Sequence, residues 1–201
     1  MNGKNHLISG VAVGADAALA ATYISRIFPA AGEFLADRLS PFARFSGTAG
    51  IACCAFAAGA YLFGTILPDV DNGGLVSRYL HLKLPCRHRG WTHSIWAMAA
   101  ILAVSFFGSG SQYLGMAAWV CRYLALGMLA HDAMDGLSVA GWVMFYPFGR
   151  WRVYKGTVMK QGWTPGLYSS AQAGSESVVT CAIVVSSAAV WAFLAYVMFF
   201  T

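Results

Sequence analysis

Three long stretches of the chain carry no charged side chain at all. No Asp, Glu, Lys or Arg occurs in residues 45–68, 90–121 or 177–201, and the shortest of these stretches has 24 residues. A helix needs about 20 mostly apolar residues to cross the hydrocarbon core of a bilayer, so each stretch is long enough to span it. Only 10% of the chain is charged, whereas soluble domains carry about 25% charged residues. We therefore expect a polytopic membrane protein.

The hydrophobic pattern predicts an all-α fold, a bundle of about five transmembrane helices that forms a single domain over residues 1–201. The predicted spans are 6–28, 47–68, 91–108, 113–136 and 176–199, and the two longer loops are 69–90 and 137–175. Because successive spans alternate in direction, both long loops lie on the same side as the N-terminus.

Basic residues are distributed unevenly between the two predicted sides. The side with the N-terminus and the long loops holds nine of them, and the other side holds only Arg26, Arg38 and Arg44. The positive-inside rule then places the N-terminus and both long loops in the cytoplasm. The net charge of +5 reflects this topology, and we expect no nucleic-acid partner.

The 137–175 loop mixes aromatic residues with Arg150, Arg152, Lys155 and Lys160. This mixture is typical of a membrane interface, where aromatic rings lie at headgroup level and cations face anionic lipid headgroups. Alternatively, the loop guides a membrane lipid or another phosphate-bearing substrate into a site. The sequence leaves both interpretations open.

Histidine and acidic residues gather at the ends of the predicted spans. The starts of odd-numbered spans and the ends of even-numbered ones lie on one face of an alternating bundle. Nine such residues fall there: His6, Asp69, Asp71, His88, His93, His131, Asp132, Asp135 and Glu176. We expect all nine at the cytoplasmic end of the bundle. Ionisable groups between membrane helices are costly and are candidates for function.

The residue types in this group are those that bind divalent metals. Imidazole nitrogens and carboxylate oxygens are the usual ligands of Zn²⁺, and a catalytic site keeps one position open for water. His131 and Asp135 are four residues apart, so they project from one face of a helix. Asp69 or Asp71 and His88 or His93 could complete the ligand set. A leftover carboxylate such as Asp132 could orient ligands or act as general base.

These motifs resemble those of a known family. Four motifs are similar to those of the YdjM-type inner-membrane proteins: an N-terminal His-x-x-x-Gly, then Leu-Pro-Asp-x-Asp, His-Arg-Gly-x-Thr-His-Ser and His-Asp-x-x-Asp. The members of this family are described as membrane-bound, metal-dependent hydrolases, some under LexA control. That family is thought to be distantly akin to zinc-dependent phospholipase C and single-strand nucleases. By order along the chain, the resemblance implies His6, Asp69 or Asp71, His88 or His93, and His131 with Asp135 as the matching ligands.

One departure limits the number of metal ions. The soluble zinc enzymes add a late His-x-x-x-Glu, whereas Gln172 stands four residues before Glu176 here and no histidine follows His131. One or two ions therefore fit better than three. Zn²⁺ is the expected ion, with Mn²⁺ and Mg²⁺ as alternatives.

The resulting prediction is a membrane-embedded hydrolase of the bacterial inner membrane. It acts through metal-activated water at the cytoplasmic face on an ester or phosphodiester, such as that of a phospholipid. The predicted metal ligands are His6, Asp69, Asp71, His93, His131 and Asp135; the predicted catalytic or substrate-binding residues are His88, Arg89, Asp132 and Glu176. The alternative is a non-enzymatic ion or small-molecule transporter, or a metal-binding membrane partner protein. A transporter normally places its site near the midplane, so clustering at one face favours the hydrolase.

Overall fold

The computed structural model describes residues 3–30, 33, 47–72, 89–108, 114–137, 142–148, 151–154, 157–160 and 175–200. Five long helices dominate these residues: α1 (Gly3–Ile27), α3 (Gly47–Gly64), α5 (Ile95–Gly108), α6 (Leu114–Gly136) and α7 (Ser175–Phe200). Two short 3-10 helices, η2 (Pro68–Asn72) and η3 (Trp91–His93), lie between them in the chain. The five predicted helices are thus confirmed at closely similar positions.

Among the helices, as far as the structure describes them, none is both long enough and apolar enough to cross a membrane, so the predicted membrane crossing is not confirmed.

A small antiparallel sheet lies where the sequence predicted only a loop. Its strands are β1 (Trp151–Tyr154) and β2 (Thr157–Lys160), with Trp151 opposite Lys160 and Tyr154 opposite Thr157. Each strand is only four residues long, too short for a hydrophobic period to stand out in the sequence. The all-α prediction therefore describes the bundle but misses this hairpin.

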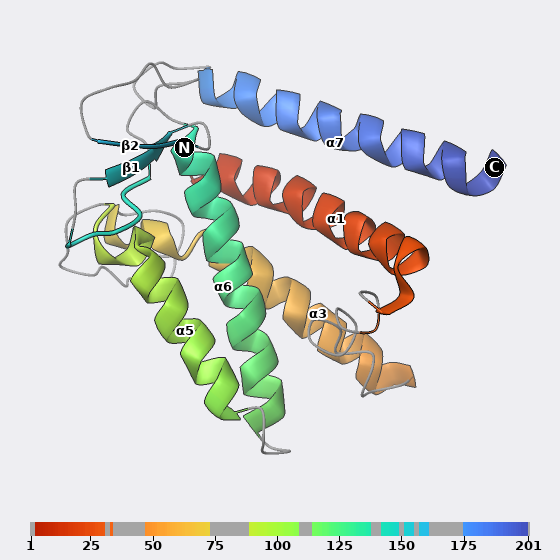
Figure 1. Ribbon diagram of the computed structural model, residues 1–201, viewed down its shortest axis with the longest axis horizontal. Coiled ribbons are helices and arrows are strands. Elements are labelled where there is room, and N and C mark those ends of the chain that lie inside the picture. Colours follow the sequence, from red (N-terminus) through yellow and green to blue (C-terminus); the bar gives the residue numbers. More distant parts are fainter. Residues whose placement is uncertain are drawn as a thin grey trace.

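Helix α6 is the centre of the packing. It contacts α3, α5 and α1, while α7 packs along α1. In Figure 1, the hairpin lies at one end of the bundle. Helices α1, α5 and α7 begin there, and the chain leaves helices α3 and α6 there. This is the convergence of helix ends that the alternating direction of the helices predicts.

The second predicted helix ends earlier than expected, and proline explains why. Helix α3 stops at Gly64 and is followed by a turn into η2, which begins at Pro68. Proline has no backbone N–H and disfavours helical geometry in the residue before it. The chain therefore leaves the α-helix before Asp69, and the carbonyl of Thr65 lies beyond the helix end.

Burial in this structure is unusual for a water-soluble fold. Several of the most completely buried side chains are polar, among them His6, His131 and Asp132. In contrast, large apolar side chains lie on the surface, such as Phe56 and Phe106 with 64% and 66% of their area exposed. Polar groups are thus enclosed by the helices, and much of the outer surface is apolar.

Two glycines allow α3 and α6 to pack closely at their crossing. A Cβ atom placed on Gly127 would overlap the carbonyl oxygen of Tyr61 and lie 2.9 Å from the Cα of Gly64. A Cβ on Gly64 would overlap the carbonyl oxygen of Leu124. The backbones approach so closely that no side chain fits between them, as in other small-residue helix contacts.

Gly127→Ala should therefore destabilise the fold. Overpacking a tight contact costs about 1–3 kcal/mol, and the thermal unfolding midpoint in detergent should fall by several degrees. Gly59→Ala in the same helix pair is the matched control, because a Cβ there would meet nothing within 4 Å and alanine favours a helix by about 1 kcal/mol over glycine. Equal midpoints for both variants would contradict the close contact.

Candidate metal centre

The site is built on the last two turns of α6. His131 and Asp135 project from the same face, with 3.9 Å between Nε2 of His131 and Oδ2 of Asp135. On the far side of the His131 ring, Nδ1 lies 2.8 Å from the carbonyl oxygen of Thr65. A carbonyl only accepts hydrogen bonds, so Nδ1 carries the proton and donates it. In the neutral imidazole, Nε2 of His131 then holds an unshared electron pair.

His93 closes the 3-10 helix η3 and faces His131. The hydroxyl of Thr92 donates to Oδ2 of Asp71 at 2.7 Å and lies 3.1 Å from Nδ1 of His93. With its single hydrogen given to Asp71, the Thr92 hydroxyl can only accept from His93. The proton of His93 is therefore on Nδ1, beside the Asp71 carboxylate at 3.7 Å.

The two histidines consequently point electron pairs at each other. Their Nε2 atoms are 3.2 Å apart and both side chains are buried. Two unprotonated nitrogens at this distance repel unless a cation lies between them. Two nitrogens bound tetrahedrally to one zinc ion, each at about 2.0–2.1 Å, are roughly 3.3–3.4 Å apart. The pair therefore has the spacing of two ligands on one metal ion.

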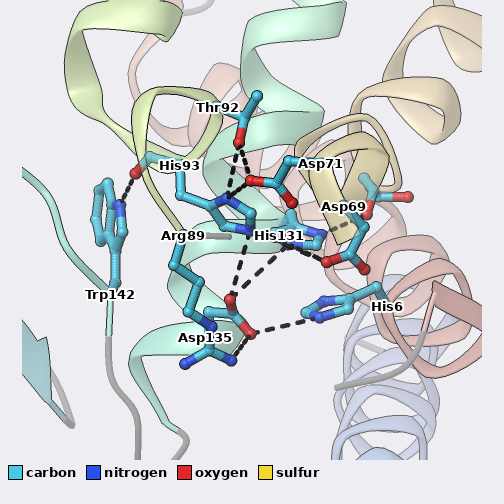
Figure 2. A network of polar contacts seen from close by, with 10 residues as sticks. His6, Asp69, Asp71, Arg89, Thr92, His93, His131, Asp135 and Trp142 are labelled. Atoms are coloured by element: carbon cyan, nitrogen blue, oxygen red, sulfur yellow. Dashed lines mark hydrogen bonds and ion pairs between the residues drawn. The ribbon is translucent and has the colours of Figure 1, made fainter. Parts of the chain in front are cut away.

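Two carboxylates flank this histidine pair. Oδ1 of Asp69 lies 3.8 Å from Nε2 of His131 and 4.0 Å from Nε2 of His93. Oδ2 of Asp135 lies 3.7 Å from Nε2 of His93. Figure 2 shows these groups gathered around the two imidazoles, with Asp69 supplied by η2 and Asp135 by α6.

A third imidazole comes from the beginning of α1. The ring of His6 stacks on that of His131, with centroids 3.8 Å apart and planes inclined by 21°. His6 is buried, and neither of its ring nitrogens has a hydrogen-bond partner among the described residues. Its Nε2 lies 3.5 Å from Oδ1 of Asp135. A buried imidazole with unsatisfied nitrogens is unusual, and a ligand at this point would satisfy it.

These residues could hold a metal ion. Two overlapping groups have ligand atoms within 4.8 Å of one another: His6, His131 and Asp135, and Asp69, His93 and His131. Both groups include His131, whose Nδ1 is bonded to Thr65, so only Nε2 is available to a metal. One nitrogen binds one ion, so the two groups share the one ligand atom that His131 offers.

Asp71 lies in a different position from the other predicted ligands. Its Oδ2 contacts Nδ1 of His93, on the side of the ring opposite to His131. A carboxylate at this nitrogen fixes the tautomer and orientation of a metal-binding histidine. The geometry thus favours Asp71 as the residue that orients His93.

The residues predicted to be catalytic are not all in the described part of the chain. Arg89 donates to Oδ1 of Asp135 at 3.0 Å and has a positive φ of 59°. Asp132 is fully buried, and neither carboxylate oxygen has a hydrogen-bond partner within the described ranges. His88 lies outside the described residues. Glu176 belongs to the first turn of α7, but its side chain lies outside them too.

Three contributors to the site are absent from the sequence prediction. Thr65 contributes a backbone carbonyl, which has no sequence signature. Trp142 donates its indole N–H to the carbonyl of His93, whereas the sequence offered only a membrane interface or a substrate-guiding loop for this segment. Thr92 stands within the His-Arg-Gly-x-Thr-His-Ser block, so its position next to His93 was the one available signal.

Comparison with known proteins supports the resemblance of the motifs. A family model described as "YdjM inner membrane protein" matches residues 1–201, the whole chain. No curated protein and no solved structure matches.

Asp71→Asn should weaken metal binding without abolishing it. Loss of a carboxylate that orients a ligating histidine lowers metal affinity by about 10–100-fold, which a competition titration with a chelating dye would measure. Asp16→Asn is the matched control, since Asp16 lies on α1 and accepts a hydrogen bond from Ser187 of α7. Complete loss of metal in Asp71→Asn would instead make Asp71 a direct ligand.

Proposed function

We propose that this chain, which belongs to the YdjM inner membrane protein family, is a membrane-embedded, metal-dependent hydrolase of an ester or phosphodiester. The observation that supports this proposal best is the buried pair of imidazoles with facing Nε2 atoms 3.2 Å apart. Carboxylates flank the pair, and the ring of His6 stacks on it, with an Nδ1 atom that has no hydrogen-bond partner among the described residues. Such a cluster is costly to bury unless an ion occupies it.

The donor set favours one zinc ion. Three imidazoles and two carboxylates, His6, His93, His131, Asp69 and Asp135, would hold the ion. Imidazole suits Zn²⁺, whereas Mg²⁺ and Mn²⁺ prefer sites made of oxygen atoms. The single available nitrogen of His131 supports one ion over the two that the sequence also allows.

When bound, such an ion supplies a water of lowered pKa and a Lewis acid for the substrate oxygen. The protein's own residues then bind, orient and move protons. Asp132 follows His131 directly and its carboxylate oxygens lack hydrogen-bond partners among the described residues. We assign it the role of general base, which accepts a proton from the attacking water. Arg89, held beside Asp135, would orient a phosphate oxygen through its planar fork of N–H groups.

The distribution of polar and apolar surface supports a place in the membrane. Phe56, Phe106 and Val178 are each more than 60% exposed, whereas the charged residues of the site are enclosed. A lipid environment favours this arrangement, because apolar side chains face hydrocarbon and ionisable groups face the interior of the bundle. The excess of basic residues in the 69–90 and 137–175 segments supports a site on the cytoplasmic side of the inner membrane.

The position of the site argues against the transporter alternative. The ligands lie at the end of the bundle where helices begin and end (Figure 1). Secondary transporters bind substrate near the midplane, between repeats, and no repeat stands out in this sequence. Hydrolysis at the membrane surface fits this location better.

His131→Ala should abolish both metal content and hydrolysis while the protein still inserts and folds. Elemental analysis of purified protein and cleavage of bis-p-nitrophenyl phosphate would measure the two effects. His81→Ala is the matched control, because it removes a histidine that is not among the predicted ligands. Metal in the wild type without cleavage of any ester would support a metal-binding partner protein instead. Retained cleavage in His131→Ala would overturn the mechanism.

A further inference from the structure

Four aromatic side chains lie in two ring pairs next to the metal centre, and all but the half-buried Tyr146 are exposed. Trp91 of η3 packs edge-to-face on Tyr146, with ring centroids 5.9 Å apart, and Trp96 of α5 packs edge-to-face on Phe148, with centroids 6.0 Å apart. We call these four residues the aromatic platform. Trp91 is 50% exposed and Phe148 is 79% exposed. Large aromatic rings that pair with each other yet remain exposed indicate a contact surface.

The platform is tied to the metal centre by short connections. Trp91 is two residues before His93 in the same 3-10 helix. The segment that carries Tyr146 and Phe148 is held by two hydrogen bonds, from the Trp142 indole to the carbonyl of His93 and from the N–H of Ile95 to the carbonyl of Met144. Figure 2 shows Trp142 beside His93. Whatever binds the platform therefore lies next to a metal-binding histidine.

The sequence around Tyr146 and Phe148 indicates what the platform binds. Residues 137–175 contain four basic residues, Arg150, Arg152, Lys155 and Lys160, and no acidic residue. The β1–β2 hairpin in this segment packs against α6, whose last turns carry the site. Exposed tryptophan, together with a chain segment whose charged residues are all basic, complements the headgroup layer of an anionic bilayer, where indole rings partition and cations face anionic lipid.

We propose that the aromatic platform docks into the headgroup layer of an anionic lipid bilayer, so that the metal centre receives the ester of a lipid directly from the membrane. The docking is independent of catalysis, and the choice of a lipid ester rests on the proposed hydrolase function. When the platform lies in the headgroup layer, the side of the metal centre formed by η3 is at the depth where lipid esters lie. A water-soluble ester would reach the same centre without contacting the platform.

Fluorescence quenching tests the docking without any assumption about catalysis. The full-length protein is reconstituted in phosphatidylglycerol–phosphatidylethanolamine vesicles whose lipids are brominated near the headgroup. We expect the double variant Trp91→Phe/Trp96→Phe to lose a large part of the quenchable emission. Trp119→Phe, at a buried tryptophan, should leave that part unchanged. Equal quenchable emission in the wild type and the double variant would overturn the docking. That result is expected if a protein partner covers the platform or if nothing does.

A comparison of two substrates tests the lipid ester. The variants Phe148→Ala and Trp96→Ala/Phe148→Ala should hydrolyse a phospholipid in vesicles at least about tenfold more slowly, because each removes aromatic surface that the headgroup layer would bury. Hydrolysis of soluble bis-p-nitrophenyl phosphate and metal content should not change. Phe106→Ala is the matched control, since Phe106 is also exposed but lies near the opposite end of α5.

The outcomes separate the two proposals. Equal loss on both substrates, or the same loss in Phe106→Ala, would overturn the role of the platform in substrate delivery while leaving the hydrolase function intact. Hydrolysis of neither substrate by the wild type would overturn the hydrolase function, and the quenching experiment would then decide the docking by itself.

Discussion

The facing Nε2 atoms of His93 and His131 are the contact on which the rest of the site depends. Both rings are fixed from behind, His131 by the carbonyl of Thr65 and His93 by Thr92 with Asp71. These hydrogen bonds place both protons on Nδ1 and leave two electron pairs directed at one point. An arrangement that repels itself when empty persists in a fold only if the surrounding structure holds it. The surrounding helices provide that support.

Close helix contacts put the Thr65 carbonyl where His131 needs it. The glycine contact between Gly64 and Gly127 brings the end of α3 against α6 one turn before His131. Gly10 of α1 gives a second close contact, because a Cβ there would lie 2.6 Å from the Thr65 side chain. One turn before Gly10, His6 then reaches the face of the His131 ring. Small residues that appear to serve only packing thus set the positions of two imidazoles.

The helices and the gathering of their polar ends could be predicted from the sequence. The charge-free stretches contain α3, α5 and nearly all of α7. Because successive helices alternate in direction, the polar ends of the helices come together. The sequence could not separate Asp69 from Asp71, because two aspartates in one 3-10 turn differ only in the direction of their side chains. The Thr65 carbonyl and the short β1–β2 hairpin were also beyond prediction, since neither a backbone acceptor nor a four-residue strand leaves a periodic pattern.

The balance of charge in the site gives an independent reason for a bound cation. Four buried carboxylates, those of Asp69, Asp71, Asp132 and Asp135, lie in or beside the site, and Arg89 forms an ion pair with one of them. Carboxylates gathered in this way favour a bound cation, because burying their negative charge costs several kcal/mol per ion unless a cation compensates it. A ligand that binds only the folded state adds stability through its affinity, so a cation bound here would also hold together the end of the bundle that it occupies.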